Sequence, residues 1–184
     1  MIEIFERFAN DPVEILLDSL VLGLFQAGPL VLAAIGFTLI YYLNGFINVA
    51  YGETLVIGAY TALVLNTGIL LPFTLELNFW FTIIPAAIVA GLASVAMFLL
   101  VFRPAMKRGV GPTEMIILSV GFSFVIRFGM RIIFGPRNKN FDPGDVSSLE
   151  IAGINVTDYQ LTALALSAAI VVGLYLFIFR TDYG

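Results

Sequence analysis

Long runs of residues without a charged side chain constrain this chain more than any other feature. The hydrocarbon core of a bilayer is crossed by about 20 consecutive apolar residues in a helix. The first run, Ser19 to Leu43, contains no charged residue and would be about 37 Å long as an α-helix. Similar runs recur along the chain, so we predict five bilayer spans. Their approximate limits are residues 19–43, 54–71, 79–102, 115–134 and 159–179.

The overall composition agrees with lipid as the solvent. Only 12% of the 184 residues are charged, whereas a soluble domain has about 25%. So few charges are too few to cover a water-facing surface, and the apolar residues are gathered into runs of span length. We therefore predict an all-α integral membrane protein with a single transmembrane domain over residues 1–184. It should be a bundle of about five helices with a broken segment between the first two.

The first run contains Gly28-Pro29 near its middle. Proline lacks the backbone donor and clashes with the preceding helical turn, so this pair should kink or break the helix. The run is then either one bent span or two shorter spans. The second alternative would raise the number of spans to six.

Several function classes are excluded by the residues that the chain lacks. It has no cysteine and no histidine, which removes thiol nucleophiles, histidine-based metal sites and histidine-centred acid–base chemistry. It has no phosphate-binding loop that ends in Lys-Ser or Lys-Thr. Its net charge is −4, and its basic residues form no stripe that would bind nucleic acid. We expect no cofactor, no metal and no enzymatic activity, so any energy from ATP must come from another chain.

The basic residues near the span ends predict the orientation, because lysine and arginine are enriched in cytoplasmic loops. The link between the third and fourth spans and the residue after the fifth span should therefore be cytoplasmic. The loop 135–158 would then lie outside, the loop 44–53 inside and the acidic N-terminus outside. The basic residues that carry this prediction are Arg103, Lys107, Arg108 and Arg180.

Two predicted spans carry small residues at intervals of four, a spacing that lets helix backbones approach closely. The alternative is that apolar helices simply contain many alanines. The two stripes are Ala86, Ala90 and Ser94 in the third span, and Ala165, Ala169 and Gly173 in the fifth.

The segment from Gly36 to Tyr60 is the densest group of polar and glycine residues beside a span. Asn44-Gly45 is typical of a turn or helix break. Glu53 follows Gly52 where the second run starts, and three hypotheses remain open for it. It could cap that helix, bond to a neighbouring helix as a buried carboxylate, or take part in a substrate pathway, since ionisable groups at membrane depth often mark pathways.

This segment resembles the permease subunits of the branched-chain amino-acid type ABC importers, which include relatives for urea and short amides. The family commonly has an Asn-Phe-Ala-His-Gly-Glu core, and here Val49 and Tyr51 stand in place of its aromatic residue and its histidine. The matching residues are Ile35-Gly36-Phe37-Thr38, Tyr41, Gly45, Ile47-Asn48, Ala50, Gly52-Glu53 and Gly58-Ala59-Tyr60. By this resemblance, Asn48, Tyr51, Gly52 and Glu53 are candidates for the substrate pathway or its gate.

The resemblance continues with less specific elements. Arg103-Pro104 is similar to a cytoplasmic loop of the family, Ile117 to Gly121 followed by Phe124 to its next helix, and Phe179 to Gly184 to the start of the segment that couples to the ATPase. The chain is therefore expected to correspond to the N-terminal part of such a permease. The implied partners are a second, homologous permease subunit, two cytoplasmic ATP-binding subunits and an extracytoplasmic substrate-binding protein.

The resemblance implies transport of branched-chain or related amino acids across a prokaryotic cell membrane. The alternatives are a urea or short-amide permease of the same family, or a membrane scaffold without transport activity. Arg127 and Arg131, four residues apart near the end of the fourth span, either reach the outer interface or line a path for a carboxylate. We favour the interface. Asp142 and Asp145 either shape a turn, which we favour, or contact a binding protein.

Overall fold

The computed structural model describes residues 12–69, 78–137, 139, 141, 148–151 and 154–180. It divides into two compact units, residues 1–36 with 145–184, and residues 37–144. Asp142, Asp145 and the ends of the chain at 1–11 and 181–184 lie outside the described residues.

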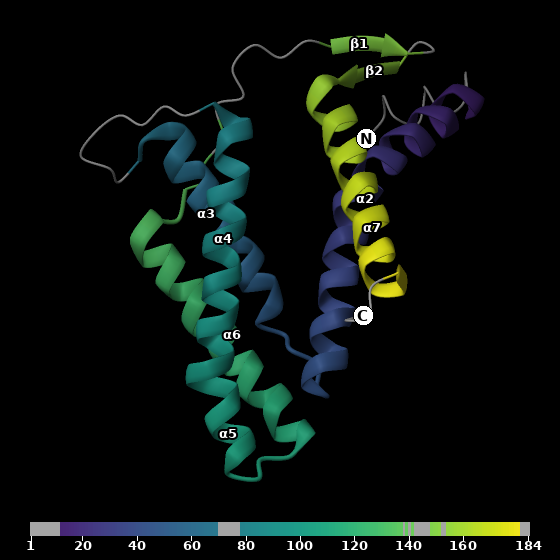
Figure 1. The fold of residues 1–184 in the computed structure, drawn as a ribbon. Helices are drawn as coiled ribbons and strands as arrows, with labels where there is room; N and C mark the ends of the chain where they lie inside the picture. Colours follow the sequence, from purple (N-terminus) through teal and green to yellow (C-terminus); the bar gives the residue numbers. More distant parts are fainter. Residues whose placement is uncertain are drawn as a thin grey trace. The chain divides into compact units, whose positions relative to one another are not determined.

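The described chain is almost entirely helical, which confirms the predicted fold class (Figure 1). Within the residues that the structure describes, four stretches are long and apolar enough to cross a membrane: Ser19–Asn44, Phe79–Lys107, Pro112–Phe134 and Asp158–Arg180. The helix over the second predicted span, α3, is shorter, with 17 residues or about 26 Å. The helices are α2 (Pro12–Asn44), α3 (Tyr51–Thr67), α4 (Phe79–Met97), α5 (Arg103–Lys107), α6 (Pro112–Phe134) and α7 (Asp158–Arg180), with a π-helical segment, η1 (Phe98–Phe102), between α4 and α5.

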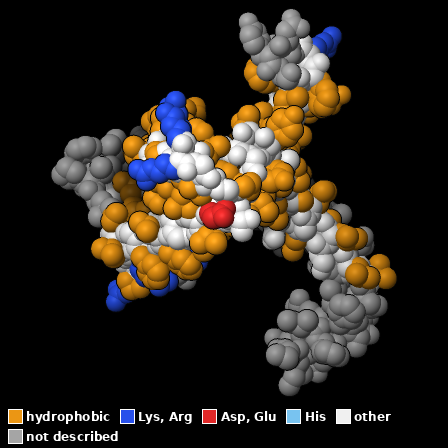
Figure 2. Space-filling view, turned by 90° about the horizontal axis from the view of Figure 1, so that it is seen from below, with side chains coloured by type: hydrophobic (Ala, Val, Ile, Leu, Met, Phe, Trp, Pro, Cys, Tyr) orange, Lys and Arg blue, Asp and Glu red, His pale blue; other side chains and the backbone are white. Residues whose placement is uncertain are grey.

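Large apolar side chains lie on the outside of these helices. Leu100 is 76% exposed and Ile132 is 83% exposed, and hydrophobic side chains are spread widely over the face shown in Figure 2. An apolar surface of this extent is unfavourable in water and favourable against lipid tails. The exposure therefore agrees with a multi-pass membrane protein.

In the first unit, α2 is continuous through Gly28 and Pro29, so the alternative of two separate crossings there is wrong. Gly28 instead permits a close contact with α7. A Cβ added at Gly28 would lie 3.2 Å from the Cβ of Ser167 and 3.2 Å from the Cδ1 of Leu164. The missing side chain lets the two helices approach, and this packing stabilises a helix that contains proline.

The predicted small-residue stripe on α7 does not make this contact. Ala165, Ala169 and Gly173 are exposed, whereas Ser167 is buried. Spacing alone identifies a face that permits close packing, but it does not decide which face meets a neighbour. On α7 that face is the one that carries Ser167.

A short hairpin precedes α7 and was missed by the sequence analysis, which placed a polar loop there. Strands β1 (Ser148–Ile151) and β2 (Ile154–Thr157) pair antiparallel, with Ser148 opposite Thr157 and Ile151 opposite Ile154. The β-branched residues of the second strand were the available signal.

In the second unit, the helix that starts at Phe79 continues through Arg103-Pro104 to Lys107, although the prediction ended it at Phe102. The π-helical segment η1 lies directly before Pro104. A proline clashes with the carbonyl four residues earlier and donates no hydrogen bond. A locally wider turn accommodates both defects without ending the helix.

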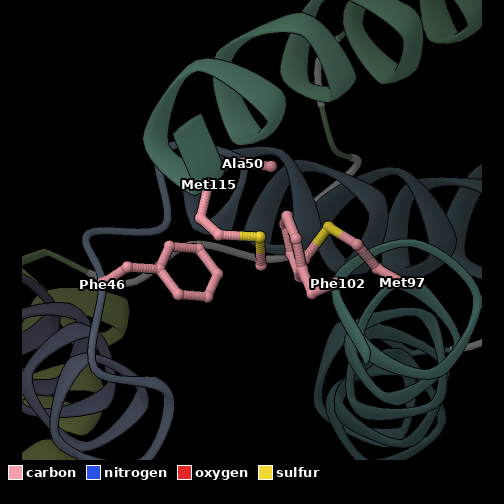
Figure 3. Close-up of a cluster of buried hydrophobic side chains, with 5 residues drawn as sticks. All are labelled: Phe46, Ala50, Met97, Phe102 and Met115. Atoms are coloured by element: carbon pink, nitrogen blue, oxygen red, sulfur yellow. The ribbon is translucent and has the colours of Figure 1, made fainter. Parts of the chain in front are cut away.

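A cluster of buried side chains joins the segment between α2 and α3 to the helices around it (Figure 3). The rings of Phe46 and Phe102 meet edge to face with centroids 5.1 Å apart, and the thioether of Met115 points toward them. Ala50 and Met97 complete the cluster. One side of the segment after α2, with Phe46 and Ala50, is therefore packed against these helices.

Candidate functional site

The break between α2 and α3 lies partway along α6. The amide of Val49 donates to the Oγ of Ser119, 3.1 Å away, and Ser119 is about 10 Å along the helix from Pro112. Figure 1 shows the ends of α4 and α6 continuing beyond the start of α3. Non-helical backbone at this depth is tolerated where protein buries it.

That residues 44–53 lie on the cytoplasmic side stays a prediction, but the structure shows that alternate side chains of this segment are buried against the helices around it. Phe46, Asn48 and Ala50 are each at most 3% exposed, whereas Ile47 and Val49 between them are 46% and 42% exposed. The sequence pattern locates the break only between two apolar runs. Which of its side chains are buried depends on how the surrounding helices pack.

The backbone of the break is held by local hydrogen bonds. The predicted break at Asn44-Gly45 is present, because α2 ends at Asn44 and Gly45 has a φ of 74°, a conformation that favours glycine. The Oδ1 of Asn48 accepts a hydrogen bond from the amide of Ala50, 3.1 Å away. The carbonyl of Asn48 accepts from the amide of Tyr51. Asn48 thus forms the turn that starts α3.

Glu53, in the first turn of α3, bonds to Arg127 of α6. Its Oε1 accepts hydrogen bonds from the Nε and Nη2 of Arg127, at 3.0 and 2.6 Å. The side chain of Glu53 is 7% exposed and that of Arg127 is 62% exposed. Of the three hypotheses for Glu53, this geometry matches the buried carboxylate bonded to a neighbouring helix.

The same pair changes the interpretation of Arg127. The sequence analysis favoured a side chain that reaches the outer interface, but Arg127 turns toward α3. It lies about 22 Å along α6 from Pro112. The carboxylate explains this position, because a buried charge is stabilised by an opposite charge that also donates hydrogen bonds. Sequence alone did not show that residues 53 and 127 meet.

A cavity of about 670 Å³ opens beside this ion pair. It is lined at one side by Gly52 and Glu53 and elsewhere by cationic and apolar groups. All of its residues belong to the second unit. The remaining lining residues are Val56, Tyr60, Arg127, Met130, Arg131, Gly135, Pro136, Arg137 and Lys139. We call it the cationic pocket.

A second cavity, of about 360 Å³, lies beside the break. Asn44, Asn48 and Ser94 supply its polar groups, and the rest of its lining is apolar. The apolar residues are Ile40, Leu43, Val95, Met97, Phe98 and Phe102. We call it the apolar pocket.

The structure divides the predicted pathway candidates between the two cavities. Asn48 lines the apolar pocket, and Gly52 and Glu53 line the cationic pocket. Tyr51 lies between them in the sequence, and its ring contacts that of Phe37 with centroids 5.9 Å apart. Gly36 lies within α2 and contributes to neither cavity.

Gly58 positions α3 against α4. A Cβ added at Gly58 would lie 3.1 Å from the Cβ of Ala90 and 3.5 Å from the carbonyl oxygen of Ala86. The predicted small residues of α4 thus lie at this contact. Ser94, one turn further, lines the apolar pocket.

Two groups of site residues were missed by the sequence analysis. One is Ser119, which holds the break; its signal was a small polar residue inside an apolar run. The other is the pair Arg137 and Lys139, which the sequence placed in a loop without a role. Their proximity to Glu53 required the fold.

Comparison with known proteins places these features in a family. Residues 19–184 match the family model described as the permease component of branched-chain amino acid transport systems. No curated protein and no solved structure matches the chain. The match covers every helix of the second unit.

Proposed function

Because the chain belongs to the family of permease components of branched-chain amino acid transport systems, we propose that it is the membrane permease subunit of an ABC importer. In this proposal it moves branched-chain or related amino acids across the cell membrane. The family and the multi-pass helices support transport, and the substrate and the direction are the parts that we propose.

The observation that carries the proposal is the helix break that lies partway along α6. A passive anchor requires only intact apolar helices, whereas here α2 and α3 are separated by a partly buried turn with an ion pair and two cavities beside it. In transporters, substrate sites are often built at such breaks, where backbone and polar side chains line a cavity.

The proposed partners follow from the family and from what the chain lacks. The sequence has no phosphate-binding loop, so ATP hydrolysis would occur in two separate cytoplasmic subunits. A second permease subunit would complete the pathway, and an extracytoplasmic protein would deliver the substrate.

Reconstitution of the assembled complex tests this proposal. The tagged chain, produced in its own host, would be isolated with its partners and placed in liposomes that contain ATP. We expect ATP-dependent uptake of radiolabelled leucine, isoleucine or valine when the binding protein is outside. Liposomes loaded with a non-hydrolysable ATP analogue are the control.

Urea and acetamide, supplied in the same assay, distinguish the alternative substrate class. Uptake of these compounds without uptake of amino acids would support a urea or amide permease. If the assembled complex hydrolyses ATP but moves none of the five compounds, the proposed substrate class is wrong. Assembly without any ATPase partner would favour the scaffold.

A further inference from the structure

We propose that the cationic pocket binds a zwitterionic amino acid with an apolar side chain. In this arrangement Arg131 and Arg137 bind the carboxylate of the ligand, and Glu53 binds its ammonium group. The inference rests on the proposed function, and it assigns a location and a set of contacts to the substrate.

The charges of the lining favour an anionic group. Four cationic side chains face one carboxylate, that of Glu53. Glu53 is paired with Arg127, and among the described residues this is the one ion pair. Arg131, Arg137 and Lys139 thus have no carboxylate partner in the part of the chain that the structure describes. Arginine suits a carboxylate because its planar N–H groups can form two parallel hydrogen bonds.

Glu53 supplies the one negative charge of the lining. Both hydrogen bonds from Arg127 end on Oε1, and a carboxylate has acceptor sites on both oxygens. The second oxygen, Oε2, is therefore the acceptor that a ligand ammonium would use. Gly52 precedes Glu53 in the lining, and its lack of a side chain leaves this side of the pocket open.

The apolar part of the lining suits an aliphatic side chain. Val56 and Met130 lie in the same lining as the charges, together with the ring of Tyr60. The volume, about 670 Å³, lies within the range of about 300–1,000 Å³ that is usual for small-molecule sites. Urea and short amides carry neither a carboxylate nor an ammonium group and have no aliphatic side chain, so the charged residues of the lining would have no charged partner.

Direct binding to the chain in lipid nanodiscs tests the site without requiring transport. The probes are leucine, isoleucine and valine, with leucinamide, which lacks the carboxylate, and 4-methylpentanoate, which lacks the ammonium. We expect at least one of the three amino acids to bind. We expect the corresponding Kd of each leucine analogue to be about tenfold higher or more. Urea should not compete.

Charge-matched variants locate the binding. Arg131→Gln and Arg137→Gln should each raise the Kd by about tenfold to a hundredfold, because each removes a charge-assisted hydrogen bond. Arg108→Gln makes the same change in charge on an exposed residue outside the pocket, and its Kd should stay unchanged. Arg131→Lys keeps the charge and should recover part of the affinity. A monodisperse elution profile and an unchanged circular dichroism spectrum check the fold of each variant.

Three outcomes would overturn the inference: no binding of any of the three amino acids, equal affinity for leucine and leucinamide, or an equal Kd in Arg131→Gln and Arg108→Gln. These outcomes are separate from the failure of the proposed function. A complex that transports leucine with an unchanged KM in Arg131→Gln and Arg137→Gln keeps its function and lacks this site. A complex without transport still permits the binding measurement.

Discussion

Glu53 and Arg127 are joined by two hydrogen bonds at 3.0 and 2.6 Å, across two helices and 74 residues of sequence. The two side chains differ in burial: the glutamate side chain is 7% exposed and the arginine side chain is 62% exposed. The first turn of α3 is thereby tied to α6 beside the cationic pocket. The consequences of losing either partner should differ.

Removing Arg127 should destabilise the chain more than removing Glu53. Arg127→Gln leaves a buried carboxylate without its partner, at a cost of about 1–3 kcal/mol. Glu53→Gln leaves an arginine that remains largely exposed, where exposed ion pairs are worth about 0–1 kcal/mol. The measurement is the midpoint of thermal unfolding in nanodiscs. The double variant should be more stable than Arg127→Gln, and strict additivity of the two changes would contradict the coupling.

A side chain at position 58 should destabilise the packing of α3 against α4 unless α4 moves away. Gly58→Ala places a Cβ 3.1 Å from that of Ala90, so we expect a lower unfolding midpoint. Gly121→Ala is the matched control, since a Cβ there meets no atom within 4 Å and alanine favours a helix by up to about 1 kcal/mol. Ala90→Gly combined with Gly58→Ala should restore part of the loss. Equal midpoints for the two glycine variants would contradict the proposed close contact.

Ser119 should hold the segment between α2 and α3 against α6 and so slow its local unfolding. Ser119→Ala removes the acceptor of the Val49 amide, which should destabilise that contact by about 1–3 kcal/mol. Amide hydrogen exchange of a peptide that covers residues 45–50 should accelerate. Ser123→Ala is the control, because the Ser123 hydroxyl bonds to the Val120 carbonyl within α6. Faster exchange in both variants, or in neither, would show that Ser119 does not hold this segment.

Gly45 should be sensitive to a side chain because of its backbone. Its φ of 74° lies in the left-handed region, where a residue with a Cβ costs about 1–2 kcal/mol and asparagine is tolerated better. Gly45→Ala should lower the unfolding midpoint, and Gly45→Asn should lower it less. A Cβ at this position meets no atom within 4 Å, so a steric clash is excluded as the cause. An unchanged midpoint in Gly45→Ala would mean that the turn adopts another backbone conformation.

The predicted orientation can be read directly, because the chain has no cysteine of its own. Arg108→Cys and Phe141→Cys introduce single thiols beyond the two ends of α6. We expect a membrane-impermeant maleimide to label residue 141 in intact cells and residue 108 only after permeabilisation. The reverse pattern would invert the predicted orientation of the chain.

The sequence by itself determined the solvent of this protein and the class of its fold. Uncharged runs such as 19–43 and 79–102 cross a bilayer whatever their neighbours are, because the backbone of a helix satisfies its own hydrogen bonds. The residues 36–60 also determined the family resemblance, and the family match confirmed it. These properties depend on residues close together in the sequence, so the sequence alone predicts them.

Only the tertiary structure decided where the break lies along α6 and which residues its polar side chains bind. Nothing in the residues around Glu53 identifies Arg127 as its partner, and nothing in the composition of α7 shows that Ser167 packs against Gly28. Gly28-Pro29 has the local chemistry of a break, yet α2 is continuous there. Contacts between distant segments depend on how helices pack, and packing selects one face among several that the sequence permits.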